Sequence, residues 1–171
     1  LATWVLEPGC VPQPEGSPDP ASVATDDPAV LLSTSGTTGA PKGAILTHGN
    51  LLGCGASLAE ALDLGPRESM GTALPLFHVF GQSVSLNAGF RHTATLVLQP
   101  RFDAREALEI MNREGVTMIC AVPTMYIQLL AAVAENPDIP VPQLEDAVSG
   151  GSPLPGPAGE RFGAPPSAEI S

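Results

Sequence analysis

The sequence predicts an α/β fold, a layered domain of sheet and helices, from three observations. Short apolar runs typical of strands alternate along the chain with segments of helical periodicity. Residues 116–122 form a nearly continuous apolar run, as expected of a strand that is buried on both faces. Hydrophobic residues make up 43% of the 171 positions, so the chain has enough apolar material for the core of one domain.

The first elements lie on either side of a polar segment. Strand-like runs at 29–32 and 44–47 flank residues 33–43, which predicts a strand, a tight polar loop and a second strand. Helical spacing then extends from residue 48 to residue 64, although Gly53 and Gly55 weaken this helix.

The middle of the chain predicts two strands with a loop and a weak helix between them. We expect a strand at 70–74, a loop at 75–81 with the sequence PLFHVFG, and a weakly helical stretch up to residue 90. Residues 93–98 are rich in β-branched side chains and predict the next strand.

The last third of the chain carries the clearest helix signal. Asp103 followed by Glu106 is typical of a helix start, and the apolar face continues to Gly115. After the strand at 116–122, Pro123 suits the first turn of another helix. A short strand is then expected to end in the glycine-rich turn at 149–153.

The chain divides by composition into three parts. Residues 1–28 are Pro-rich and predict a linker that follows the end of a preceding strand at 1–6, residues 29–155 form a partial domain, and residues 156–171 an irregular Pro/Gly-rich tail without a stable helix. Because the chain begins at Leu1 without an initiator Met, we expect it to be an excerpt of a longer protein.

Charge and cysteine content exclude several function classes. Seven Lys and Arg stand against 18 Asp and Glu, a net charge of -11, which argues against binding to nucleic acid or to an anionic membrane. The three cysteines, Cys10, Cys54 and Cys120, form no C-x-x-C pair, so we expect no disulfide framework, no metal ligands and a reducing, cytoplasmic location. No apolar run reaches the length of a membrane span.

Residues 33–43, STSGTTGAPKG, have the composition of a phosphate-binding loop. Glycines let backbone amides approach phosphate oxygens, hydroxyls donate to them, and Lys42, which is the single lysine of the chain, offsets their charge. The segment differs from the Walker motif because Pro41 precedes the lysine and Gly43 follows it. The alternative is an ordinary hairpin loop.

Four segments resemble successive motifs of the adenylate-forming (AMP-binding) superfamily, which includes acyl-CoA synthetases, peptide-synthetase adenylation domains and luciferases. They are TSGTTGAPKG (34–43), LPLFHVFG (74–81), the segment 98–126 and VSGGSPLP (148–155). The sequence PLFHVFG and the later PRFD are most similar to long-chain fatty-acyl-CoA synthetases. The resemblance implies part of the large N-terminal domain of such an enzyme.

The resemblance also implies a reaction and its cofactors. Such enzymes join a carboxylate to ATP, with Mg²⁺, to give an acyl adenylate and pyrophosphate, and most then transfer the acyl group to coenzyme A. By this resemblance the β- and γ-phosphates are held by the phosphate-loop residues Thr34, Ser35, Gly36, Thr37, Thr38, Gly39 and Lys42.

The remaining motifs imply contacts with the acid and with adenine. His78 is expected to orient the carboxylate, with a buried histidine bonded to the backbone as the alternative. Val122, Pro123 and Thr124 are expected to line the acyl tunnel, or simply to join a strand to a helix. The resemblance places adenine against a second set of turn residues: Gly151, Ser152 and Pro153.

Several family motifs are missing from this sequence. The Glu that helps to bind magnesium, the ribose-binding Asp and the small C-terminal domain are absent, so we expect the chain alone to be incomplete and inactive. Three alternatives stay open: an excerpt of a working acid-CoA ligase, a truncated fragment that binds nucleotide or acyl chain without catalysis, and a small nucleotide-binding module with a regulatory role.

Overall fold

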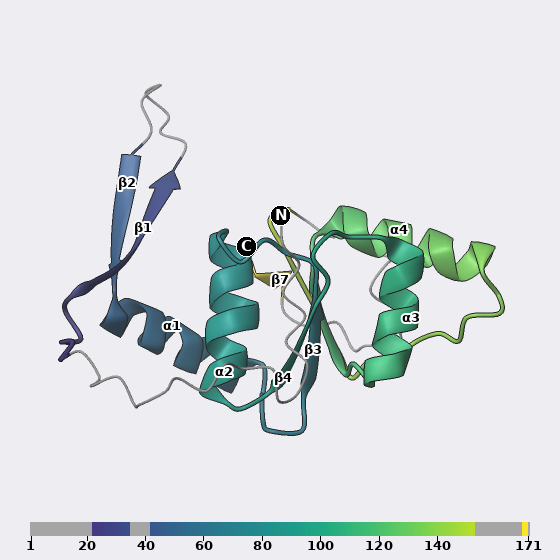
Figure 1. The fold of residues 1–171 in the computed structure, drawn as a ribbon, viewed down its shortest axis with the longest axis horizontal. Helices are drawn as coiled ribbons and strands as arrows, with labels where there is room; N and C mark the ends of the chain where they lie inside the picture. Colours follow the sequence, from purple (N-terminus) through teal and green to yellow (C-terminus); the bar gives the residue numbers. More distant parts are fainter. Residues whose placement is uncertain (1–21, 35–41, 153–168, 171) are drawn as a thin grey trace, which may run out of the picture.

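The structure, a computed structural model, describes residues 22–34, 42–152 and 169–170. These residues form an antiparallel ribbon of two strands and a sheet of five strands in the order β4-β3-β5-β6-β7 (Figure 1). Every pair in the larger sheet is parallel. The predicted α/β class with sheet and helix layers is therefore confirmed.

The ribbon confirms the two strands predicted on either side of the polar segment. β1 (Pro28–Thr34) pairs with β2 (Lys42–Thr47), and Thr34 stands opposite Lys42 in the last pair of the register. The loop that joins them lies outside the described residues. Figure 1 shows the ribbon standing clear of the five-stranded sheet.

α1 (His48–Ala61) begins at a capping box that the sequence analysis did not identify. The Thr47 side chain accepts from the Asn50 amide at 3.2 Å, and the Asn50 side chain accepts from the Thr47 amide at 3.0 Å. The helix ends three residues earlier than predicted. Asp63 has a positive φ of 49°, and Leu64 is turned into the core with its amide bonded to the Ala59 carbonyl at 2.9 Å.

The strands of the larger sheet explain the buried apolar run at 116–122. The sheet is built from β3 (Ser69–Thr72), β4 (Thr95–Leu98), β5 (Met118–Ala121), β6 (Asp146–Gly150) and β7 (Glu169–Ile170). In β5, Met118 and Cys120 pack into one hydrophobic core and Ile119 and Ala121 into another. The strand thus separates two cores, which is why its residues do not alternate in polarity.

Helices cover both faces of this sheet. α1, η1 (Gly81–Ala88) and α2 (Gly89–Arg91) lie on one face, and α3 (Ala104–Glu114) and α4 (Pro123–Glu135) on the other (Figure 1). The weakly helical stretch predicted up to residue 90 is mainly the π-helix η1. Gly55 of α1 allows the two helices to pack closely, because a Cβ there would lie 3.3 Å from the backbone of Asn87 in η1.

Both helices of the second face begin as predicted. Asp103 accepts from the Glu106 amide at 2.9 Å at the start of α3, and Pro123 occupies the first turn of α4. Gly115, with φ of 61°, ends α3 in the left-handed region that favours glycine. The Tyr126 hydroxyl lies within 3.2 Å of the Ile119 carbonyl and 3.0 Å of the Val148 carbonyl, which ties α4 to β5 and β6.

The predictions for the two ends of the chain fall mostly outside the described residues. Residues 22–27 are exposed and precede β1, whereas most of the predicted linker and the strand expected at 1–6 lie outside the described residues. β7, which pairs with β6, was not predicted, and the remainder of the tail from 153 to 168 is outside the description. Within the described ranges, no helix is long and apolar enough to cross a membrane.

Candidate functional site

Three loops meet at one edge of the parallel sheet. They follow β3 (residues 73–80), β5 (Val122, which leads directly into α4) and β6 (residues 151–152). Since neighbouring parallel strands end at the same edge, the register places their carboxyl ends side by side: Thr72 pairs with Cys120, and Cys120 with Val148. The carboxyl edge of an open parallel sheet is where α/β folds bind their ligands.

Contacts between the loops join motifs that are far apart in the sequence. The Phe80 ring lies against Gly150, where a Cβ would be only 3.0 Å from Phe80 Cζ. Val122 lies beside Gly151, because a Cβ on this glycine would be 3.7 Å from Val122 Cγ1. The PLFHVFG loop, the residue before α4 and the Gly-Gly turn are therefore neighbours in space.

His78 lies exposed on the first of these loops. Its backbone amide donates to the Pro75 carbonyl at 3.0 Å, and its Nδ1 accepts from the Phe80 amide at 3.2 Å. A ring nitrogen that accepts from a backbone N–H carries no proton itself, so this bond assigns the imidazole proton to Nε2. The Nε2–H of the exposed His78 is therefore a hydrogen-bond donor on the loop after β3.

The loop closes on itself behind His78. A Cβ on Gly81 would lie 2.6 Å from the Pro75 carbonyl oxygen, so only glycine permits this approach. The Gln82 amide donates to the His78 carbonyl at 2.9 Å, which links the loop to the first turn of η1.

The segment before α4 divides into buried and exposed residues. Pro123 is buried, Val122 is half-buried, and Thr124 is exposed. The Val122 carbonyl accepts from the Met125 amide at 2.9 Å, which fixes the first turn. Of these three residues, Thr124 has the side chain most accessible from solvent, whereas Pro123 contributes to the core.

The glycine-rich turn after β6 is open to solvent. Gly151 has a positive φ of 88° and is exposed, as is Ser152. Pro153 lies outside the described residues. A turn of this kind presents backbone groups without side chains, which suits contact with a flat ring.

The phosphate loop is described only at its two ends. Thr34 ends β1 and Lys42 begins β2, where Lys42 is exposed. Outside the described residues are Ser35, Gly36, Thr37, Thr38 and Gly39. Figure 1 shows that the ribbon of β1 and β2 stands apart from the five-stranded sheet whose edge carries the three loops.

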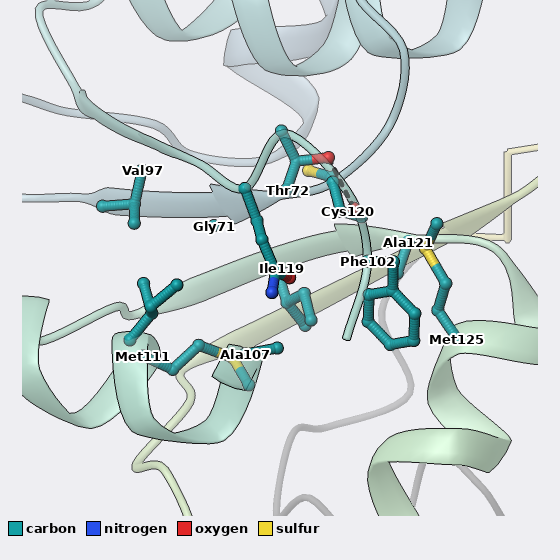
Figure 2. A pocket seen from close by; sticks show the side chains of 13 residues that line it. Gly71, Thr72, Val97, Phe102, Ala107, Met111, Ile119, Cys120, Ala121 and Met125 are labelled. Carbon is teal, nitrogen blue, oxygen red and sulfur yellow. Dashed lines mark hydrogen bonds between the residues drawn. The ribbon is translucent and has the colours of Figure 1, made fainter. Parts of the chain in front are cut away.

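A cavity of about 30 Å³ lies behind the carboxyl ends of β3 and β5 (Figure 2). Apolar side chains from the sheet and from α3 line most of it, and it has room for about one water molecule. Burial raises the pKa of the Cys120 thiol to about 12, and the neighbouring Ser85 side chain offsets only part of this rise, so the thiol stays neutral. The cavity is too small to hold an organic acid. A second pocket of about 280 Å³ lies between α1, η1 and α2, but none of the residues predicted for the site line it; its lining residues are Leu51, Leu52, Asn87, Phe90 and Arg91.

The described part of the chain holds no group of three or more His, Cys, Asp or Glu residues able to bind a metal ion. These residues therefore do not fit a magnesium ion held by side chains alone.

Two residues at this edge were not singled out from the sequence. Phe80 stands two positions after His78 in the same motif, and this proximity was the available signal. Thr72 had no such signal, because its bond to the Cys120 carbonyl joins residues 48 positions apart.

Comparison with known proteins identifies the family. The family model of the AMP-binding enzymes matches residues 3–165. A feruloyl-CoA synthase of Amycolatopsis sp is 34% identical over 148 residues, which cover 86% of this chain and 30% of the relative. A long-chain-fatty-acid–CoA ligase of Bacillus subtilis is 34% identical over 143 residues, covering 80% of this chain and 24% of the relative.

Solved structures agree with the fold. A malonyl-CoA ligase in a ternary product complex, with methylmalonyl-CoA and AMP bound, superposes with a TM-score of 0.72 at 31% identity. The match covers 81% of this chain and 30% of that structure, so the chain spans less than a third of the length of these relatives. The chain belongs to the AMP-binding enzyme family, whose relatives found here are acid-CoA ligases.

Proposed function

We propose that this chain is part of an ATP-dependent, AMP-forming acid-thiol ligase that transfers an acyl group to coenzyme A. A carboxylate oxygen attacks the α-phosphorus of ATP, and the bond to pyrophosphate breaks to leave an acyl adenylate. The thiol sulfur then attacks the acyl carbon, and AMP leaves. The supporting observation is the meeting of the His78 loop, the start of α4 and the Gly-Gly turn at one sheet edge.

Each predicted residue has a role in this proposal. The Nε2–H of His78 donates to the acid carboxylate as the new bond forms, while Thr124 and Val122 border the acyl group. Gly151 and the following Ser152 and Pro153 lie against adenine. The phosphate loop with Lys42 holds the β- and γ-phosphates, which requires it to approach the sheet edge. Magnesium, when bound, offsets charge on the phosphates.

The acid is proposed to be a fatty acid. The apolar and aromatic side chains beside His78 favour a hydrophobic acid, since Phe77 is 84% exposed and Val79 is 48% exposed at the same edge. The relatives act on different acids by name, feruloyl and long-chain fatty acyl groups among them. A cytoplasmic location is also proposed, supported by the absence of a paired-cysteine pattern in the sequence.

Acid-dependent release of pyrophosphate tests this function. Two samples are compared: the purified chain, and a longer protein that includes this sequence and spans the length of the relatives. Each is incubated with Mg-ATP, coenzyme A and one acid: palmitate, octanoate, ferulate or malonate. The proposal predicts release with the longer protein that is fastest with a fatty acid, and none with the chain alone. Fastest release with ferulate or malonate would contradict the fatty substrate and keep the ligase.

Lys42→Ala tests the phosphate loop in the same assay. Loss of this cation is expected to lower the rate by about 10²-fold, the usual cost of one group that stabilises a transition state. Arg113→Ala is the matched control, because Arg113 pairs with Glu114 on the surface of α3. Equal rates for Lys42→Ala and Arg113→Ala would refute the role of Lys42.

The alternative is a fragment that binds nucleotide without catalysis. The chain spans less than a third of its relatives, and this observation favours binding without turnover for the chain by itself. Stabilisation by Mg-ATP without pyrophosphate release in any longer protein would support this alternative.

A further inference from the structure

We infer that Thr72 is a positioning residue for His78, acting through the loop that joins β3 to η1. This inference rests on the proposed function, in which His78 orients the carboxylate. Thr72 is the last residue of β3 and is only 6% exposed, so it touches no substrate itself.

The Thr72 hydroxyl makes two buried hydrogen bonds at the point where the loop begins. It donates to the Cys120 carbonyl at 2.9 Å, across to its register partner on β5, as Figure 2 shows. It accepts from the Leu74 amide at 3.0 Å, two residues further along its own chain. One side chain therefore fixes both the neighbouring strand and the first step of the loop.

The fixed start of the loop is connected to His78 through short contacts. Leu74 is buried, and the carbonyl of the next residue, Pro75, accepts from the His78 amide at 3.0 Å. Gly81 packs against the same carbonyl and closes the loop. A shift of the backbone at Leu74 thus moves the turn that carries His78.

Valine at position 72 would keep the shape of threonine but remove the hydroxyl. The Leu74 amide and the Cys120 carbonyl would then be buried without this partner, a costly state for backbone polar groups. The loop would move to find other partners for its amide, and His78 would lose its fixed place.

Thr117 provides a control within the same pair of strands. It precedes β5 at the opposite end, where its Oγ1 accepts from the Ser69 amide at 3.0 Å. Thr117→Val therefore removes an equivalent bridge between the β3 and β5 segments, but at the edge of the sheet remote from His78.

The first test is amide hydrogen exchange in the purified chain, which needs no activity. The Leu74 amide should be protected in the wild type, and Thr72→Val should speed exchange at Leu74, His78 and Phe80 about tenfold or more. Thr72→Ser should restore protection, and Thr117→Val should affect Ser69 instead. An unprotected Leu74 amide in the wild type, or the same pattern in both valine variants, would overturn the inference.

The second test uses pyrophosphate release by the longer protein. Thr72→Val should raise the KM for the acid and lower kcat together by about tenfold, while Thr72→Ser and Thr117→Val stay within about twofold of the wild type. An unchanged acid KM and kcat in Thr72→Val would overturn the positioning role. Absence of release in the wild type would instead refute the proposed function, and the exchange data would still decide whether Thr72 holds the loop.

Discussion

The contact between Phe80 and Gly150 connects two motifs that lie 70 residues apart. Three atoms of the Phe80 ring would lie 3.0–3.3 Å from a Cβ on Gly150, closer than ordinary van der Waals contact. Because the ring fills this space, the glycine is needed for the aromatic side chain rather than for an unusual backbone angle. The candidate site therefore requires a residue without a side chain at position 150, in addition to its polar residues.

Gly150→Ala is expected to destabilise the chain by about 1–3 kcal/mol, because an added methyl group forces the ring to move. Gly53→Ala is the control, since a Cβ there has nothing within 4 Å and alanine favours a helix. Urea unfolding measures both free energies. Equal effects of the two substitutions would contradict the packing described, and Phe80→Leu combined with Gly150→Ala should recover part of the loss.

Single residues of the candidate site were predictable where a local motif marks them. His78 and the Gly150-Gly151 pair stand in short segments of recognisable composition. Phe80 and Thr72 owe their importance to contacts with β6 and β5, which the chain reaches only after folding. No local pattern carries that information.

At the scale of elements, α3 shows how local signals set a helix. Asp103 caps its first turn, and Gly115 ends it in a left-handed conformation. The Glu106 carboxylate also accepts from Gln99 Nε2 at 3.0 Å, so the first turn is fastened to the end of β4. The start of the helix therefore combines a local cap with one tertiary bond.

Asp103→Ala is expected to lower the free energy of unfolding by about 1 kcal/mol, since the Glu106 amide loses its acceptor. Asp103→Asn should retain most of this stability because an amide oxygen also accepts there. Thermal and urea unfolding of both variants check the prediction. An alanine variant as stable as the asparagine variant would show that the cap contributes nothing.

Helices with caps and fully apolar strands were predictable element by element. α3, α4 and β5 match their predicted ranges to within a few residues, because capping residues, a first-turn proline and a continuous apolar run mark them. The π-helical form of η1 was not predicted, because the sequence marks only a weak helix there. β7 pairs only with a strand distant in sequence, which leaves no local signal.

At the scale of the whole molecule, the acidic excess gathers partly at the amino edge of the sheet. Burial raises the pKa of the Asp146 carboxyl, and the negative charges of Glu145, Glu68 and Asp63 raise it further. The folded-state pKa of this carboxyl is higher than its ordinary value of 3.8, so the group contributes to the stability of the native state when it is protonated. This contribution is complete at pH values below 3.8 and is lost as the pH rises through the folded-state pKa.

Asp146→Asn is therefore expected to raise the unfolding temperature at pH 7, where the native carboxylate is penalised. The gain should shrink as the pH falls toward about 4, because the carboxyl of the wild type then becomes neutral. The exposed Asp138→Asn serves as the control. Thermal unfolding of the wild type and both variants is measured between pH 7 and pH 4. A rise in the unfolding temperature of Asp146→Asn that is independent of pH would contradict a raised pKa for Asp146.

The meeting of three motifs was predictable at the whole-molecule scale, but the position of the ribbon was not. Parallel strands bring their following loops to one edge whatever their sequences, so an α/β fold alone implies the arrangement. The ribbon is an antiparallel pair outside that sheet, and its place depends on contacts that no periodicity records.

The measurement that tests the central claim most directly is thermal unfolding of the purified chain with and without Mg-ATP. A ligand that binds only the folded state stabilises it by RT ln(1 + [L]/Kd), so the unfolding temperature rises with the concentration of ligand relative to its Kd. We expect a cooperative transition whose midpoint temperature rises with Mg-ATP, with the rise lost in Lys42→Ala and kept in Arg113→Ala. No rise with Mg-ATP, or an equal rise in Lys42→Ala, would contradict the claim that this chain carries the phosphate-binding part of an AMP-binding enzyme.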